Sequence, residues 1–195
     1  GSIWIGSFGS GIYRYYPDQN KYDLYETSAD TNSISYHSST HILKDNRNRL
    51  FFATEVGLNV YNREKNNFTR VKTADKPDGL SSDYITCMVK DTHGKFWIGT
   101  LANGLNLFDP ETLKAKQIFK DRKDLDDVGI TSLMIDSKGL LWVGSAIGLF
   151  SLDTKTEKIT SYTKLHTALS SQIPSIQEDI TGFIWVTNPQ GICKL

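Results

Sequence analysis

Three groups of residues in this sequence could do chemistry. The glycine-rich stretch "GSFGSG", from Gly6 to Gly11, has the composition of loops that cradle phosphate when a helix begins directly after them. Four aspartates recur at equivalent places and could hold a metal ion. Four histidines and two cysteines could act as acids, bases, nucleophiles or ligands. These residues are Asp45, Asp91, Asp136, Asp179, His37, His41, His93, His166, Cys87 and Cys193.

The glycine-rich stretch is not followed by a helical pattern. Its neighbour "IYRYY" is a short apolar run, and no segment places apolar residues at i, i+3, i+4 and i+7. "GTLANG", "GSAIG", "ATEVG" and "TNPQG" stand in corresponding places and also link one apolar run to the next. We therefore interpret the glycines as turn glycines, which allow the positive φ that short hairpin links need.

The aspartates are spaced 43 to 46 residues apart, which predicts one in each structural repeat and no convergence on one ion. We expect each to accept backbone N–H bonds within its own Asp-x-x-Gly turn. No metal and no cofactor is predicted. Because HExxH, GxSxG, the Walker lysine motif and paired Cys–His spacings are missing, no catalytic residue is predicted. His93 is expected in a solvated turn, and Cys87 as a buried, inert thiol.

Composition favours a folded soluble section of a longer protein. The chain has 195 residues, of which 38% are hydrophobic and 23% charged. Twenty-two basic residues balance 22 acidic ones, so a nucleic-acid partner is not expected. The apolar runs are far shorter than the roughly 20 residues that span a bilayer, so membrane attachment would come only through segments absent here.

A repeat runs through the whole chain. Its aromatic anchors are separated by 43 to 47 residues and are Trp4, Phe51, Trp97, Trp142 and Trp185. The best copy divides into four short segments at 84–90, 95–100, 105–109 and 115–119, with turn residues between them. A four-stranded antiparallel meander of this length is typical of a β-propeller blade.

We therefore predict an all-β fold, a β-propeller fragment with three complete and two partial blades. The copies are expected at 1–28, 29–74, 75–120, 121–165 and 166–195. "FWI", "LWV" and "IWV" predict second strands covered on both faces, with the aromatic anchors in the core between blades. The third strands are expected to alternate between buried and exposed positions. Arg14 replaces an apolar residue, so the outer part of the first blade is expected to be more exposed or to pair with an acid.

The combined unit D-x-x-G-x-x-W-[IV]-G-[TS], followed by Gly-Leu, resembles the two-component regulator propeller repeat. "DGLSSDYITCMVKD", at 78–91, is similar to the linker and inner strand that introduce each copy in that family. The resemblance implies a section of the periplasmic sensor region of a Bacteroidetes-type hybrid histidine kinase anchored in the inner membrane. Such sensors commonly respond to polysaccharide breakdown products. It also implies no catalysis by this section, with the kinase elsewhere in the full-length protein.

Binding residues are expected in the loops between second and third strands and in those that enter each inner strand, because both sets share one face of a propeller. Aromatic rings with Asn, Glu and Gln suit an oligosaccharide, although surface loops are ordinarily polar. A propeller enzyme, such as a polysaccharide lyase or glycosidase, and a protein-interaction scaffold are the alternatives. Open sheet edges also predict contact with the rest of the sensor or with a second sensor chain in a homodimer. The candidate residues are Phe8, Tyr36, His37, Glu55, Asp83, Tyr84, Asn103, Asn188 and Gln190.

Overall fold

The computed structural model describes residues 1–71, 78–120, 125 and 127–195. Its strands form five antiparallel sheets, three of four strands and two of three, so the predicted all-β propeller fragment is confirmed. Within these ranges no helix has the length and apolar character needed to cross a membrane. The predicted repeat boundary at 74/75 and the repeat start at 121 lie outside the described residues.

Each sheet is a meander in which consecutive strands pair. The first contains β1 (Ile3–Gly6), β2 (Ile12–Tyr16) and β3 (Lys21–Tyr25), and a short 3-10 helix, η1 (Pro17–Gln19), joins the last two. The second sheet contains β4 (Ser39–Lys44), β5 (Leu50–Thr54), β6 (Gly57–Asn62) and β7 (Asn67–Val71), and the third contains β8 (Ile85–Lys90), β9 (Phe96–Thr100), β10 (Leu105–Asp109) and β11 (Lys114–Gln117). The fourth sheet contains β12 (Ile130–Ile135), β13 (Leu140–Ser145), β14 (Gly148–Asp153) and β15 (Ile159–Ser161). A second 3-10 helix, η2 (Thr167–Ser170), precedes the fifth sheet, which contains β16 (Ser175–Glu178), β17 (Ile184–Asn188) and β18 (Gly191–Lys194).

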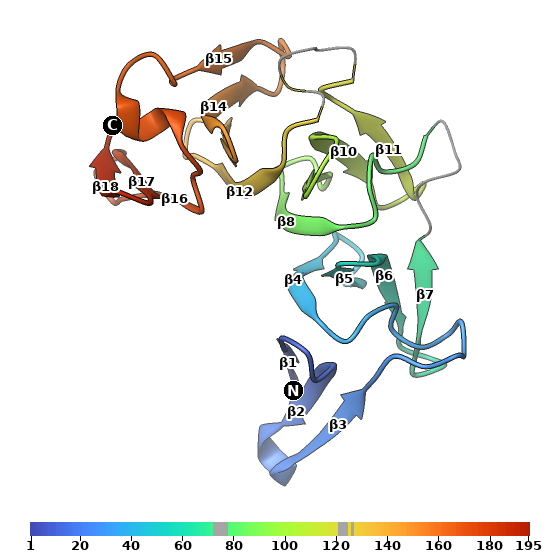
Figure 1. The fold of residues 1–195 in the computed structure, drawn as a ribbon. Helices are drawn as coiled ribbons and strands as arrows, with labels where there is room; N and C mark the ends of the chain where they lie inside the picture. The colour runs from blue at the N-terminus through green and yellow to red at the C-terminus, as the bar shows by residue number, and fades with distance from the viewer. Residues whose placement is uncertain (72–77, 121–124, 126) are drawn as a thin grey trace.

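The five sheets follow one another along an arc (Figure 1). Strands β4, β8, β12 and β16 lie on its inner side, where β8 contacts both β4 and β12, and β12 contacts β16. Three threonines join these inner strands: Thr40 Oγ1 donates to the carbonyl of Ile85 at 3.2 Å, Thr86 to Ile130 at 2.6 Å, and Thr131 to Ile173 at 2.7 Å. β4 and β8 are therefore each hydrogen-bonded to the inner strand of the next sheet, and β12 is hydrogen-bonded to the loop just before β16.

The aromatic anchors of the three complete sheets lie in the core between sheets, as predicted. Phe51, Trp97 and Trp142 are 0%, 2% and 7% exposed. Trp142 packs with Ile184 and Val186 of the last sheet. Trp185 differs, since 39% of it is exposed. No sheet follows β16–β18 in this structure to cover it, so the expectation of a buried anchor was wrong there.

Glycines in the second strands allow the sheets to approach closely. A Cβ on Gly144 of β13 would lie 2.5 Å from the carbonyl oxygen of Ile173 and would overlap the Ser132 hydroxyl. A Cβ on Gly99 of β9 would lie 2.6 Å from a methyl group of Ile130. Ordinary atomic contacts are longer than this, so the glycine of the W-[IV]-G motif is required by the neighbouring sheet.

The third strands are more buried than predicted. In β6 both Leu58 and Asn59 are fully buried, and in β10 so are Leu105 and Asn106. The asparagines are tolerated because the loops entering the inner strands bond to them: Asn59 Oδ1 accepts from Ser35 N at 2.9 Å, and Asn106 Oδ1 from Ser81 N at 2.9 Å. The expected alternation was wrong because polar residues there secure a loop instead of facing water.

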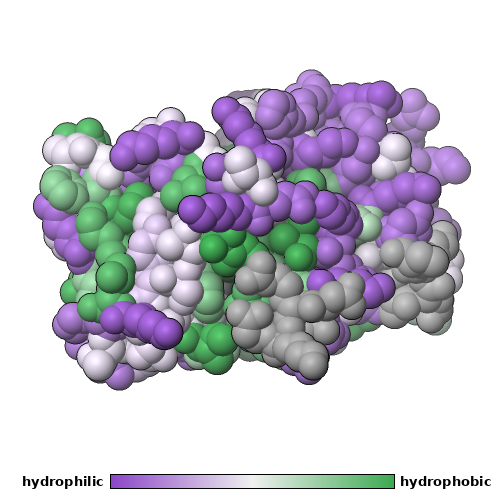
Figure 2. All heavy atoms as spheres, turned by 90° about the horizontal axis from the view of Figure 1, so that it is seen from above, coloured by the Kyte–Doolittle hydropathy of each residue, from purple (hydrophilic) through white to green (hydrophobic). Residues whose placement is uncertain are grey.

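Apolar side chains are exposed at both ends of the arc. Figure 2 shows hydrophobic atoms gathered toward the end where β16–β18 lie. The large exposed apolar residues of the first sheet are Ile3, Ile5, Tyr22 and Leu24, and those of the last sheet and its turn are Ile180, Phe183, Trp185 and Ile192. Between neighbouring sheets, the corresponding apolar faces pack against each other and are buried.

Candidate functional site

The four repeated aspartates organise their own turns, as predicted. Oδ1 of each accepts backbone N–H bonds from the residues two and four positions later, at 2.8–3.1 Å. In the last two copies Oδ2 also accepts from the tryptophan indole, at 2.9 Å from Trp142 and 2.8 Å from Trp185. In the second copy, Arg49 Nε is the donor instead of an indole and lies 2.6 Å from Asp45 Oδ2. The described residues hold no group of three or more His, Cys, Asp or Glu side chains arranged for a metal ion.

The glycine-rich stretch is a turn between β1 and β2. Ser7 Oγ donates to the carbonyl of Gly11 at 2.7 Å, and Gly9 and Gly11 have φ values of 91° and 82°. The stretch is tied to the loop before β4, because Gly11 N donates to the carbonyl of His37 at 2.7 Å. The interpretation as turn glycines is confirmed, and the turn projects Phe8, which is 92% exposed.

A pocket of about 530 Å³ lies where loops from all five sheets meet on the inner side of the arc. We call it the axial pocket. Its wall contains Phe8 from the first sheet, Glu55 from the β5–β6 turn and Tyr84 from the loop entering β8. The structure therefore brings three of the nine predicted binding residues together. Other residues lining it are Ser38, Thr40, Thr86, Leu101, Thr131, Gln172 and Pro174.

Tyr84 and Glu55 interact within the axial pocket. Burial, followed by the nearby Glu55 carboxylate, raises the pKa of the Tyr84 hydroxyl, so Tyr84 is protonated at neutral pH. The Tyr36 hydroxyl also raises the pKa of Tyr84. The rings of Tyr36 and His37 lie 4.0 Å apart between their centroids. A phenol, a carboxylate and an exposed ring can hydrogen-bond and stack on a polar ligand, and this group is suited to binding.

The remaining predicted residues lie outside the axial pocket, in loops and turns or, for Asn188, at the end of β17. The Asp83 carbonyl accepts from Gly57 N at 2.7 Å, and Asn103 Nδ2 donates to the Ser81 carbonyl at 3.2 Å. Asn188 is buried; its amide donates to Ala168 and its oxygen accepts from Gln190 N. Gln190 Oε1 accepts from Ser171 Oγ at 3.3 Å.

The threonines of the axial pocket were not among the predicted residues. Thr40, Thr86 and Thr131 are the second residues of β4, β8 and β12. The signal was present, since each lies five residues before the turn aspartate of its own repeat. Pro174 occupies this place before β16, and it has no hydroxyl to donate.

The position after each threonine carries a different side chain in each inner strand. Cys87 is buried, and burial raises its thiol pKa to about 12, which fits the expected inert thiol. Ser132 donates to the carbonyl of Ile173 at 2.7 Å. His41 has a buried Nδ1 without a hydrogen-bond partner among the described residues. His93, in its Asp-x-x-Gly turn, is exposed as predicted.

Because His41 is partly buried, we expect the protein to be less stable to unfolding in mild acid than at neutral pH. Burial lowers its pKa below the unfolded value of about 6.5, so the unfolded chain takes up the proton more readily. The free energy of unfolding should therefore fall as pH decreases through about 6.5 toward the folded pKa. His41→Ser, which copies the serine of β12, should lose less stability than the parent over that range. Urea unfolding of both proteins from about pH 7.5 to 5.5 measures the difference, and parallel curves would contradict the prediction.

The arrangement of sheets, inner strands and converging loops defines the class of the chain: it is a section of a β-propeller. Residues 79–102 and 124–146 match the family model described as "Two component regulator propeller". Two stretches of the chain therefore match two-component regulator propeller repeats, and the resemblance drawn from the sequence is confirmed.

Comparisons with known proteins agree with this family. "Histidine kinase P4" of Formosa agariphila is 28% identical over 176 residues, which are 87% of this chain and 13% of that protein. The extracellular domain of the hybrid two-component system BT3049 from B. thetaiotaomicron is 24% identical with a TM-score of 0.80, and the match covers all of this chain and 25% of that one. Virginiamycin B lyase from Staphylococcus aureus shares the fold, at 13% identity and a TM-score of 0.70 over all of this chain and 66% of the lyase. The chain thus spans about an eighth of the curated relative and a quarter of that extracellular domain.

Proposed function

We propose that the chain is a non-catalytic, ligand-sensing section of the extracytoplasmic region of a hybrid two-component system. The family match and the similarity to a histidine kinase and to an extracellular domain of a two-component system support this role. In a bacterium with two membranes this region would lie in the periplasm, and a kinase module elsewhere in the full-length protein would transmit the signal.

The ligand we propose is an oligosaccharide bound in the axial pocket. The observation that carries the proposal is that Phe8, Glu55 and Tyr84, from three different sheets, all line the axial pocket. Two aromatic side chains can cover the apolar face of a sugar ring, while the carboxylate and the threonine hydroxyls can bond its hydroxyl groups. Because several sheets contribute, a bound ligand would contact loops that are far apart in the chain.

Tyr84→Ala should weaken oligosaccharide binding by about tenfold or more, because it removes both a ring and a hydrogen-bonding hydroxyl. Titration calorimetry with a panel of plant and host oligosaccharides measures the effect. Tyr22→Ala is the matched control, since Tyr22 is 63% exposed on β3 and does not line the axial pocket. Equal losses in both variants, or no binding by the parent, would contradict the proposal.

The same titrations separate binding from catalysis. The propeller of a lyase has a similar fold, so the fold alone does not exclude an enzyme. We expect mass spectrometry to recover the ligand unchanged after prolonged incubation with the chain. A shortened or unsaturated product would instead favour the polysaccharide lyase or glycosidase alternative.

A further inference from the structure

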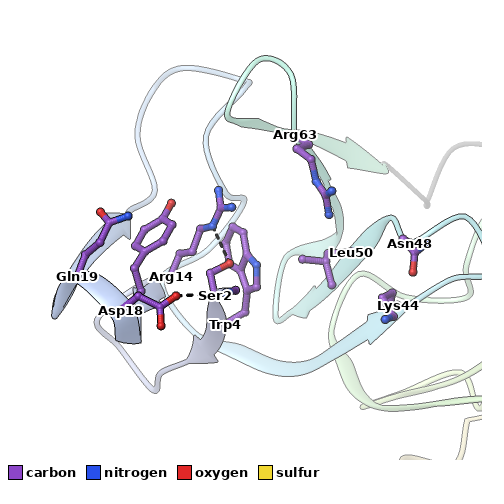
Figure 3. A pocket seen from close by; sticks show the side chains of 11 residues that line it. Ser2, Trp4, Arg14, Asp18, Gln19, Lys44, Asn48, Leu50 and Arg63 are labelled. Atoms are coloured by element: carbon purple, nitrogen blue, oxygen red, sulfur yellow. Dashed lines mark hydrogen bonds and ion pairs between the residues drawn. The ribbon is translucent and has the colours of Figure 1, made fainter.

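A second hollow lies at the other end of β4 from the axial pocket. The axial pocket contacts Ser39 and Thr40, where β4 begins, whereas the second hollow contacts Lys44, where β4 ends. Its volume is about 540 Å³. Figure 3 shows Trp4 and Arg14 on one side and Leu50 and Arg63 on the other. The first two sheets therefore flank an open hollow that is separate from the proposed sugar site.

Three cationic side chains from three elements line this hollow. Arg14 belongs to β2, Lys44 ends β4, and Arg63 lies in the turn between β6 and β7. Within the described ranges, none of the three forms an ion pair with a carboxylate. The arginines of the adjacent turn differ, because Arg47 pairs with Glu111 and Arg49 with Asp45. The hollow thus collects unpaired positive charge in a chain whose net charge is zero.

Arg14 is held in place by neutral partners. Its Nε donates to Ser2 Oγ at 3.1 Å and its Nη1 to the Tyr61 hydroxyl at 2.9 Å. Its guanidinium lies 5.3 Å from the ring centroid of Trp4 and 4.9 Å from that of Tyr16. The outer part of the first sheet is exposed at Tyr22 and Leu24, as expected, whereas Arg14 itself contacts rings and hydroxyls. Its position is fixed while its charge is left without an ionic partner.

One carboxylate also lines the hollow. Asp18 is 82% exposed, and its Oδ2 lies 3.5 Å from the amino group of Gly1. Against this single acid stand the three cations, so the cavity has an excess of positive charge. Trp4 and Leu50 add apolar surface to its walls. This combination matches a ligand that carries a negative group on an apolar framework.

We propose that this hollow binds a carboxylate or sulfate group of an anionic ligand. Arg14, Lys44 and Arg63 supply the charge-assisted hydrogen bonds, and Trp4 and Leu50 contact the part of the ligand that bears the anion. The site differs from the proposed oligosaccharide site in position and in chemistry, and it does not depend on that proposal.

The indole N–H resonance of Trp4 reports on this site in NMR titrations of the chain. There are four tryptophans, and Trp4→Phe identifies the resonance. The probes are inorganic sulfate, glucose 6-sulfate, glucuronate and neutral glucose. We expect the anionic probes to shift the Trp4 resonance at low ionic strength and to lose affinity as salt is added. Tighter binding of glucose 6-sulfate than of sulfate would place the framework against Trp4 and Leu50, and equal affinities would indicate that the anion alone is recognised.

The double variant Lys44→Gln/Arg63→Gln should weaken binding of the anionic probes by about tenfold or more, because two charge-assisted contacts are lost. Both side chains are exposed, so the fold should not change. Lys158→Gln, which removes an exposed charge outside the hollow, should leave the affinity unchanged. Unchanged affinity in the double variant, an equal loss in Lys158→Gln, or binding of glucose as tight as that of glucose 6-sulfate would overturn the proposal.

Discussion

Replacing Asp136 by alanine should lower the free energy of unfolding by about 3–5 kcal/mol. Oδ1 of Asp136 accepts from Lys138 N and Leu140 N at 3.0 and 2.8 Å, and Oδ2 from the Trp142 indole at 2.9 Å. Alanine would leave these three donors without their acceptor, and while the indole bond is buried, the two turn N–H groups are partly buried. Each buried donor left unpaired costs about 1–3 kcal/mol. Urea unfolding followed by tryptophan fluorescence measures the change.

Asp91→Ala is the matched control for Asp136→Ala. Asp91 accepts the same two backbone bonds, from His93 N and Lys95 N, but the Trp97 indole has no hydrogen-bond partner among the described residues. Its loss should be smaller by about 1–2 kcal/mol, the contribution of the missing indole bond. Equal losses at the two positions would show that the indole bond contributes nothing. A loss below about 1 kcal/mol in both would contradict the role of the aspartates in the turns.

Gly144→Val should destabilise the fold by about 3 kcal/mol or more, and Gly144→Ala by about 1–3 kcal/mol. The added Cβ would meet the Ile173 carbonyl oxygen at 2.5 Å, and backbone cannot move aside as a flexible side chain can. Relief would require the last two sheets to separate, which would break the bond between the Thr131 hydroxyl and the same carbonyl. Thermal unfolding monitored by circular dichroism measures the effect.

Thr187→Val is the matched control for Gly144→Val. Thr187 occupies the corresponding place in β17, two residues after the aromatic anchor, and is only partly buried. Because no sheet packs on the far side of β17 in this structure, a branched side chain is already accommodated there. We expect a change within about 0.5 kcal/mol. A large effect at Thr187, or none at Gly144, would contradict the explanation from sheet approach.

The sequence predicted the parts of the fold that depend on contacts within one repeat. The anchors Trp97 and Trp142, and the turn aspartates before them, follow from spacing alone, because each acts inside its own sheet or against the next. The burial of Asn59 could not be predicted in this way. Its partner is Ser35, in a loop before β4, and polarity in a strand ordinarily indicates a solvent-facing position.

The candidate sites were predicted less completely than the fold. That Phe8, Glu55 and Tyr84 lie together could be predicted, because loops of two known kinds converge on one propeller face. The cationic hollow was not predicted, since Arg14, Lys44 and Arg63 lie in different repeats and nothing in their spacing relates them. Arg14 was considered alone, and no local pattern could show that its guanidinium lies between the rings of Trp4 and Tyr16.

The hydrogen bonds from Thr40, Thr86 and Thr131 all run in one direction, from an earlier sheet to a later one. Their acceptors are 45, 44 and 42 residues further along the chain. A ribosome adds about 5–20 residues per second, so the acceptor of each threonine is synthesised roughly 2–9 s after the threonine itself. Each newly synthesised segment thus supplies the acceptor for a threonine of the preceding sheet. The three hydrogen bonds between sheets can therefore form in the order in which the chain is synthesised.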